Sequence, residues 1–159
     1  MALSSDAVLD LISLQERATV FRSAIERCDR TRLPITFSHF PAGSCGDAAL
    51  LLAKFLEESS FGQFDYVLGK RDEGSHAWLG RGDLVVDISA DQFPDISRPV
   101  IVEYHSKWHM SFEREILHVA DFEIYDERTR ATLRIAYREV LSRLSRRDAQ
   151  PCGAGDAAR

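Results

Sequence analysis

The chain has 159 residues, of which 45% are hydrophobic and 28% charged, and its formal net charge is −5. This length fits one domain that can bury a core without disulfides or a structural metal. The acidic balance disfavours a dedicated nucleic-acid-binding protein, because neutralising phosphates requires a basic surface. The three cysteines are too few and too scattered for a disulfide framework or a zinc knuckle; they are Cys28, Cys45 and Cys152.

The N-terminal segment carries two aspartates and no basic stretch ahead of an apolar run, unlike a secretory signal peptide. No uncharged apolar run approaches the ~20 residues that a membrane-spanning helix requires. We therefore expect a soluble cytoplasmic protein without a membrane span.

The first predicted element is an amphipathic helix from about Ser5 to Cys28, with apolar residues at helical spacing. Cys28 extends the apolar face of this helix, so we interpret it as a buried packing residue. A loop rich in Gly, Pro and Ser then leads into Ala48–Leu56, a segment that is apolar nearly all round. Such a helix is usually buried at the centre of a domain. Cys45 lies at its start.

Strands are predicted next, and the second and third are joined by a tight, glycine-containing connection that indicates an antiparallel hairpin. The predicted strands are Phe64–Leu68, Ser75–Leu79, Leu84–Ile88, Pro99–Glu103 and a short one at Phe122–Tyr125. A long helix is expected over Glu127–Arg147. These elements predict one α+β domain over residues 1–147, with helices packed on a small, mainly antiparallel sheet, followed by a disordered tail over residues 148–159.

The last predicted helix carries seven arginines against Glu127 and Glu139, a local charge of +5 that leaves −10 on the rest of the chain. One interpretation is a solvated face that balances an acidic body. The other is a docking surface for an acidic partner.

Three residues form a candidate catalytic group: Cys45 at a helix start, His76 within a strand and Asp87 within the next strand. A helix N-terminus and a neighbouring imidazolium both stabilise a thiolate, the reactive form of cysteine. A carboxylate that accepts the ring N–H of a histidine fixes its tautomer and stabilises its charged form. With the hairpin turn centred on Arg81-Gly82, the spacing predicts that His76 directly opposes Asp87.

These residues occur in Gly43-Ser-Cys45-Gly-Asp before the apolar helix, His76-Ala-Trp78-Leu, and Leu84-Val-Val-Asp87-Ile-Ser. This order resembles the transglutaminase-like superfamily, a branch of the papain-like cysteine enzymes, over roughly residues 40 to 93. The resemblance implies a papain-like core and a Cys-His-Asp triad that transfers acyl groups from amides through a thioester. It implies a protein or peptide substrate and no cofactor, in a peptidase, amidase, glutamine deamidase or transglutaminase.

Four further residues are candidates for shaping that site. His39 precedes Cys45 by six residues, the offset at which papain-like enzymes place a glutamine that binds the oxyanion. Gln92 is a second candidate donor, and Trp78 and Asp91 are candidates for shaping the substrate site.

Two alternatives remain open. The chain could be a catalytically inactive protein of the same fold that binds a partner through its basic helix. Alternatively, His105 and His109, with Glu103 and Glu113 nearby, have the i, i+4 spacing of some zinc sites, although no glutamate stands between the two histidines.

Overall fold

The fold, described over residues 5–148 by a computed structural model, combines helices with an antiparallel sheet of five strands in the order β4-β3-β2-β1-β5. The strands are β1 (Asp65–Arg71), β2 (Gly74–Arg81), β3 (Leu84–Asp87), β4 (Ile101–Tyr104) and β5 (Glu113–Val119). The helices are α1 (Ser5–Arg27), α2 (Cys45–Glu58), α3 (Lys107–Met110) and α4 (Glu127–Leu141). The predicted α+β class is confirmed.

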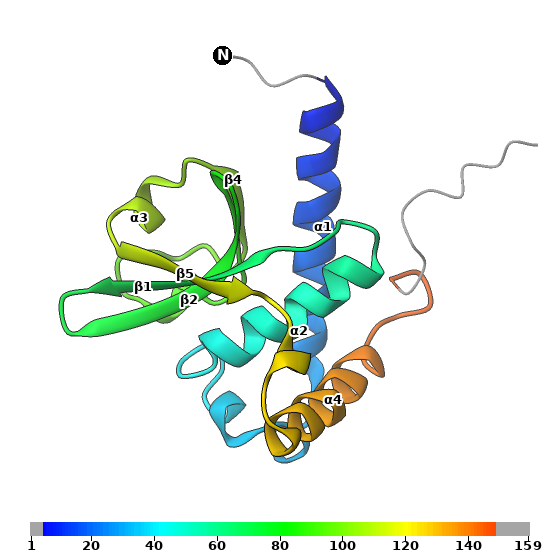
Figure 1. The fold of residues 1–159 in the computed structure, drawn as a ribbon. Helices are drawn as coiled ribbons and strands as arrows, with labels where there is room; N and C mark the ends of the chain where they lie inside the picture. The colour runs from blue at the N-terminus through cyan, green and yellow to red at the C-terminus, as the bar shows by residue number, and fades with distance from the viewer. Residues whose placement is uncertain (1–4, 149–159) are drawn as a thin grey trace, which may run out of the picture.

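Helix α2 is the central helix that its apolar sequence predicts. It packs against α1, α4 and β2, and its residues from Ala48 to Ala53 are all buried. Figure 1 shows α1, α2 and α4 gathered on one side of the molecule, with the β1–β2 hairpin reaching away from them and α3 beyond the sheet. No helix within the described residues is long and apolar enough to cross a membrane.

Strands β2 and β3 are covered on both faces: successive side chains of a strand point to opposite faces, and each face here has its own cluster of buried side chains. Leu79 of β2 joins the large core beneath the helices, whereas its neighbour Trp78 belongs to a second cluster with Val67, Val85 and Phe112. His76 lies two residues before Trp78, and Asp87 lies two residues after Val85. The side chains of both polar residues therefore lie on the face of the sheet that carries this second, largely aromatic cluster.

Two predicted elements differ from the structure. The segment Phe122–Ile124 is a 3₁₀ turn rather than a strand, and the Asp121 carboxylate accepts a hydrogen bond from the Glu123 N–H at its start. The predicted helix Glu127–Arg147 ends at Leu141. The hydroxyl of Ser142 donates to the carbonyl of Glu139 over 2.6 Å, an alternative to continued helix that serine side chains offer.

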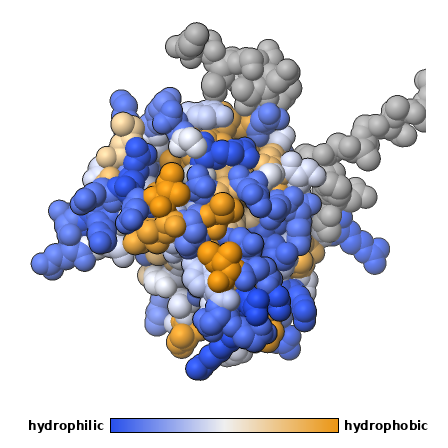
Figure 2. Space-filling view, viewed as in Figure 1, coloured by the Kyte–Doolittle hydropathy of each residue, from blue (hydrophilic) through white to orange (hydrophobic). Residues whose placement is uncertain are grey.

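Strand β5 was not predicted, because it is an edge strand whose side chains are mostly exposed on both faces. It has no alternation of apolar and polar residues from which a half-buried strand could be inferred. Figure 2 shows hydrophobic side chains gathered on the face of the molecule over β5 and the segment after it; the exposed apolar residues there are Ile116, Leu117, Val119 and Ile124.

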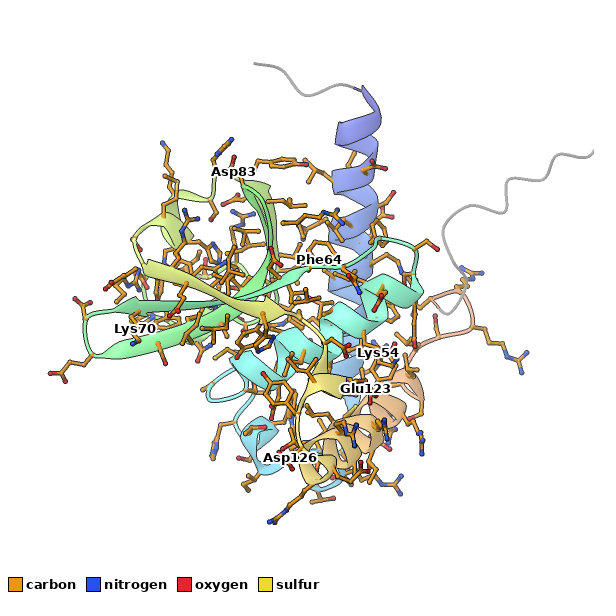
Figure 3. The ribbon with its side chains drawn as sticks, viewed as in Figure 1. Lys54, Phe64, Lys70, Asp83, Glu123 and Asp126 are labelled. Carbon is orange, nitrogen blue, oxygen red and sulfur yellow. The ribbon has the colours of Figure 1, made fainter. Side chains whose placement is uncertain are left out.

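The side chains of the turn and of α4 are drawn in Figure 3, where Glu123 lies beside α4 and Lys70 lies on the outlying β1–β2 hairpin. Glu123 pairs with Arg134 of α4 and so joins the turn to the last helix. The predicted tail, residues 148–159, falls outside the described residues apart from Asp148.

Candidate active site

Cys45 is the first residue of α2, and its side chain is partly exposed. The chain enters the helix through Gly43, whose φ of +78° is accessible to glycine at little cost. The hydroxyl of the buried Ser44 donates to the carbonyl of Pro41 over 3.0 Å and holds the loop closed. The backbone N–H groups of Ala77 and Gly46 lie near the sulfur and help to lower the pKa of the thiol.

The N–H of Ala77 is available to the sulfur because the β2–β3 pairing is short. It extends only from Leu79 to Arg81 on β2, so the earlier part of that strand has no β3 partner beside it. Cys45 lines a small interior space together with Ala77, Trp78 and Asp87, which places the start of α2 against this unpaired part of β2. The short third strand therefore makes room for the thiol.

His76 and Asp87 form a direct hydrogen bond, with 2.6 Å between Nε2 and Oδ2, and both are fully buried. The predicted register is wrong by two residues. The turn is centred on Gly82-Asp83, so Leu79 opposes Val86, and Gly82 takes the positive φ that this tight turn requires at its first central position. A shift of two residues keeps both side chains on the same face, and the pair still meets.

His109 is a second imidazole on the same carboxylate. Its Nε2 lies 2.9 Å from Oδ2 of Asp87, and its Nδ1 lies 2.7 Å from the hydroxyl of Ser106. His109 belongs to the single-turn helix α3, and its side chain is fully buried. The sequence offers His109 only as an alternative zinc ligand together with His105. In the structure His105 is exposed whereas His109 is fully buried against Asp87, so the two imidazoles do not share a site.

The Asp87 carboxylate stays ionised without solvent contact. Its other oxygen accepts the N–H of Ser89 over 2.8 Å. Burial alone would raise the pKa of Asp87, but hydrogen bonds from His109 and His76 and their charges hold it well below its usual range.

The same contacts favour an ionised Cys45 and a protonated His76. Burial disfavours the imidazolium, yet the hydrogen bond and charge of Asp87, with a smaller contribution from Cys45, raise the pKa of His76 to about 9. Burial also opposes the thiolate, but hydrogen bonding to His76 and its charge lower the pKa of Cys45 below its ordinary value. Since Nε2 of His76 is held by Asp87, its Nδ1 is the nitrogen left to exchange a proton with the thiol.

Two of the additional candidates adjoin this group. The side-chain nitrogen of Gln92 lies 3.2 Å from Nδ1 of His76 and donates to the carbonyl of Ser89 over 3.0 Å. Trp78 packs beside the imidazole, with 5.7 Å between ring centroids. Phe93 and Trp108 present their rings to the same imidazole at 5.2 and 5.8 Å and shield it from water.

The other two candidates lie elsewhere. Asp91 is bound through both carboxylate oxygens by Arg22 of α1, at 2.6 and 2.8 Å. His39 is exposed in the loop before α2, where its Nδ1 lies 3.2 Å from the hydroxyl of Ser38.

His76, Asp87 and His109 are residue types that bind zinc, and their ligand atoms lie within 4.8 Å of one another. Two atoms that ligate one zinc ion tetrahedrally are roughly 3.3 Å apart, given bonds of about 2.0–2.2 Å. The separations of 2.6 and 2.9 Å are those of hydrogen bonds instead. The arrangement suits shared protons better than a metal ion.

Searches of protein-family models, curated proteins and solved structures find no match to this chain. Cys45, His76 and Asp87 thus bring a thiol at a helix start, an imidazole and a buried carboxylate into one region of the fold.

Proposed function

We propose that the protein is a cysteine-dependent hydrolase or acyl transferase acting on amide bonds of a protein or peptide, with a transglutaminase-like, papain-like core. The observation that carries the proposal is the buried His76–Asp87 pair beside the thiol at the start of α2. The imidazole lowers the pKa of the thiol, and the buried carboxylate of Asp87 orients that imidazole. Cys28 has no comparable setting, since burial raises the pKa of its thiol.

The reaction follows from these positions. The thiolate of Cys45 adds its electron pair to the carbonyl carbon, and the C=O π pair moves to oxygen, giving a tetrahedral oxyanion. The intermediate collapses with cleavage of the C–N bond, while the His76 imidazolium gives its proton to the departing nitrogen. This leaves a thioester on Cys45. Water or an amine then attacks the thioester, His76 takes the proton of that nucleophile, and the Cys45 thiolate leaves with the electron pair of the C–S bond, which restores the starting thiolate and imidazolium.

Alkylation by iodoacetamide at a series of pH values tests the activated thiolate, with the labelled cysteine identified by mass spectrometry. We expect Cys45 to react well below pH 8.5, the ordinary pKa of a thiol. His76→Ala should move its reactivity to higher pH, because the hydrogen bond and charge that lower the thiol pKa are then absent. Cys28→Ala is the matched control and should leave the Cys45 profile unchanged. A profile for Cys45 that is identical in the wild type and in His76→Ala would contradict the proposal.

Turnover is tested by screening glutamine-containing peptides and proteins for released ammonia or new amines. The rate should rise with pH as Cys45 ionises and fall above about pH 9, where His76 loses the proton needed by the leaving group. Cys45→Ala should abolish turnover. Activity that persists in Cys45→Ala would assign the reaction to another residue.

A partner-binding protein with an unused triad is less well supported. Three arginines of the basic segment already pair with carboxylates of this chain: Arg130 with Glu127, Arg134 with Glu123 and Arg143 with Glu139. These pairs reduce the positive charge that α4 and the turn after it could offer an acidic partner.

A further inference from the structure

The N-terminus of α2 is approached by a tyrosine hydroxyl that the reaction described above leaves unused. Tyr66 lies on β1, and its hydroxyl oxygen is 2.7 Å from the position that a Cβ at residue 46 would occupy. Residue 46 is glycine, the residue directly after Cys45. Any side chain there would collide with the hydroxyl, so the glycine allows Tyr66 to reach the first turn of the helix.

The Tyr66 ring is held in place from β5. It stacks on His118, with 5.0 Å between centroids and 10° between the ring planes. Nδ1 of His118 donates to the carbonyl of Val119 over 2.8 Å, so its Nε2 is left to accept the hydroxyl of Tyr125 over 2.9 Å. His118 is thus fixed by two hydrogen bonds, and it presents a fixed face to Tyr66.

The Tyr66 hydroxyl itself keeps its proton free for another acceptor. Among residues 5–148 it has no hydrogen-bond partner, whereas the hydroxyl of Tyr125 is engaged by His118. Burial and the nearby negative charge of Cys45 raise the pKa of Tyr66 to about 12, so the hydroxyl is a donor throughout the neutral range.

We infer that Tyr66 is a catalytic residue that donates a hydrogen bond to the oxyanion formed when Cys45 attacks a carbonyl carbon. The backbone N–H of Cys45, at the helix start, is the second donor. This inference rests on the proposed function and adds to it a side chain that stabilises the negative charge on the carbonyl oxygen. It also assigns the side-chain donor to a residue other than His39, which is exposed in its loop, and Gln92, which is bound to His76 and Ser89.

The reaction with p-nitrophenyl acetate separates this role from others, because acylation of Cys45 builds an oxyanion whereas alkylation by iodoacetamide does not. In Tyr66→Phe we expect acylation, measured as release of p-nitrophenolate, to fall about 100-fold. Alkylation of Cys45 should keep its wild-type rate and pH profile. Tyr104→Phe is the matched control, since Tyr104 is an exposed tyrosine on β4, and it should retain acylation within a few-fold.

Gly46→Ala provides a second variant should Tyr66→Phe fold poorly. Alanine suits a helix better than glycine, so α2 should persist, while the new Cβ displaces the hydroxyl and slows acylation in the same selective way. Equal acylation in the wild type and Tyr66→Phe would overturn the inference and leave the proposed function standing. A parallel loss of acylation and alkylation would also overturn it, because Tyr66 would then act on the thiolate. A wild-type protein that alkylates at Cys45 but never acylates would contradict the proposed function and this inference together.

Discussion

Asp87 is a carboxylate removed from solvent that remains ionised because two imidazoles and a backbone N–H donate to it. A buried charge with fewer donors would be costly, and the usual response is protonation. His109 thus acts on Cys45 only through Asp87 and His76, as a positioning residue. Its own support comes from the hydroxyl of Ser106, which lies 2.7 Å from Nδ1.

Replacing His109 tests this role. His109→Ala removes a donor from a buried carboxylate and leaves a cavity, so we expect a loss of about 3–5 kcal/mol in the free energy of unfolding. His109→Gln keeps an N–H near the position of Nε2 and should recover part of that loss. Both are measured by urea denaturation.

A second measurement separates positioning from packing. With one donor fewer, Asp87 interacts more strongly with His76, and the pKa of His76 should rise. In folded His109→Ala, the alkaline fall in turnover should therefore occur at higher pH than in the wild type. In folded His109→Gln, which keeps a donor to Asp87, it should stay at the wild-type pH. An unchanged pH profile in His109→Ala would assign His109 a packing role alone.

The sequence was sufficient to single out Cys45, His76 and Asp87, because their spacing and the strand pattern already bring the last two to one face. It was insufficient for His109. The i, i+4 spacing from His105 suggests a shared helix face, yet α3 begins at Lys107 and His105 adopts a φ of +52° outside it. The approach of α3 to Asp87 depends on tertiary packing, which no local pattern encodes. Tyr66 likewise reaches the first turn of α2, beside Gly46, only through tertiary packing.

At the scale of elements, the face of the sheet that carries His76 is built around Trp78, and Gly69 provides the space for it. A Cβ at Gly69 would lie 2.5 and 2.6 Å from two atoms of the indole ring and 2.9 Å from Cβ of Phe112. These contacts are too short for a packed interior. Glycine is therefore required at this β1 position because the side chains of Trp78 and Phe112 leave no room for a Cβ, and not because of its own backbone conformation.

Gly69→Ala should destabilise the protein by about 1–3 kcal/mol through overpacking, measured by urea denaturation. Gly74→Ala is the control on the neighbouring strand β2, since its added Cβ meets only a carbonyl oxygen at an ordinary 3.6 Å. A Gly69→Ala variant as stable as Gly74→Ala would show that the Trp78 cluster can relax around a methyl group.

Helices and strands are predicted correctly where burial imposes a pattern of apolar residues on the sequence, and they are missed where it imposes none. Helix α2 and the β2–β3 hairpin are almost fully buried, so their composition identifies them. Strand β5 is mostly exposed and is specified by its pairing with β1, a contact between segments far apart in the chain. The hairpin register failed for a different reason, since Arg81-Gly82 and Gly82-Asp83 are both plausible turn centres and only pairing decides between them.

At the scale of the molecule, the helices and the site are joined by one buried guanidinium. Arg22 of α1 donates to the carbonyls of Ile88 and Pro99 at 2.7 and 2.8 Å, and to both carboxylate oxygens of Asp91. These acceptors belong to the segment after β3, the same segment that carries Gln92 to His76. Arg22 therefore fixes the position of that segment relative to the helices.

Arg22→Ala should lower the free energy of unfolding by about 3–5 kcal/mol, because it leaves Asp91, the buried carbonyl of Ile88 and the carbonyl of Pro99 without their donor. Arg22→Lys should recover little of this loss, since one ammonium group cannot reproduce the planar fork that binds both carboxylate oxygens. Arg98→Ala is the control, an exposed arginine paired with Glu103 whose removal should change stability by no more than about 0.5 kcal/mol. Urea denaturation measures all three. If Arg22→Ala proved as mild as Arg98→Ala, the segment after β3 would be held by its apolar contacts, and Arg22 would be dispensable for placing Gln92 beside His76.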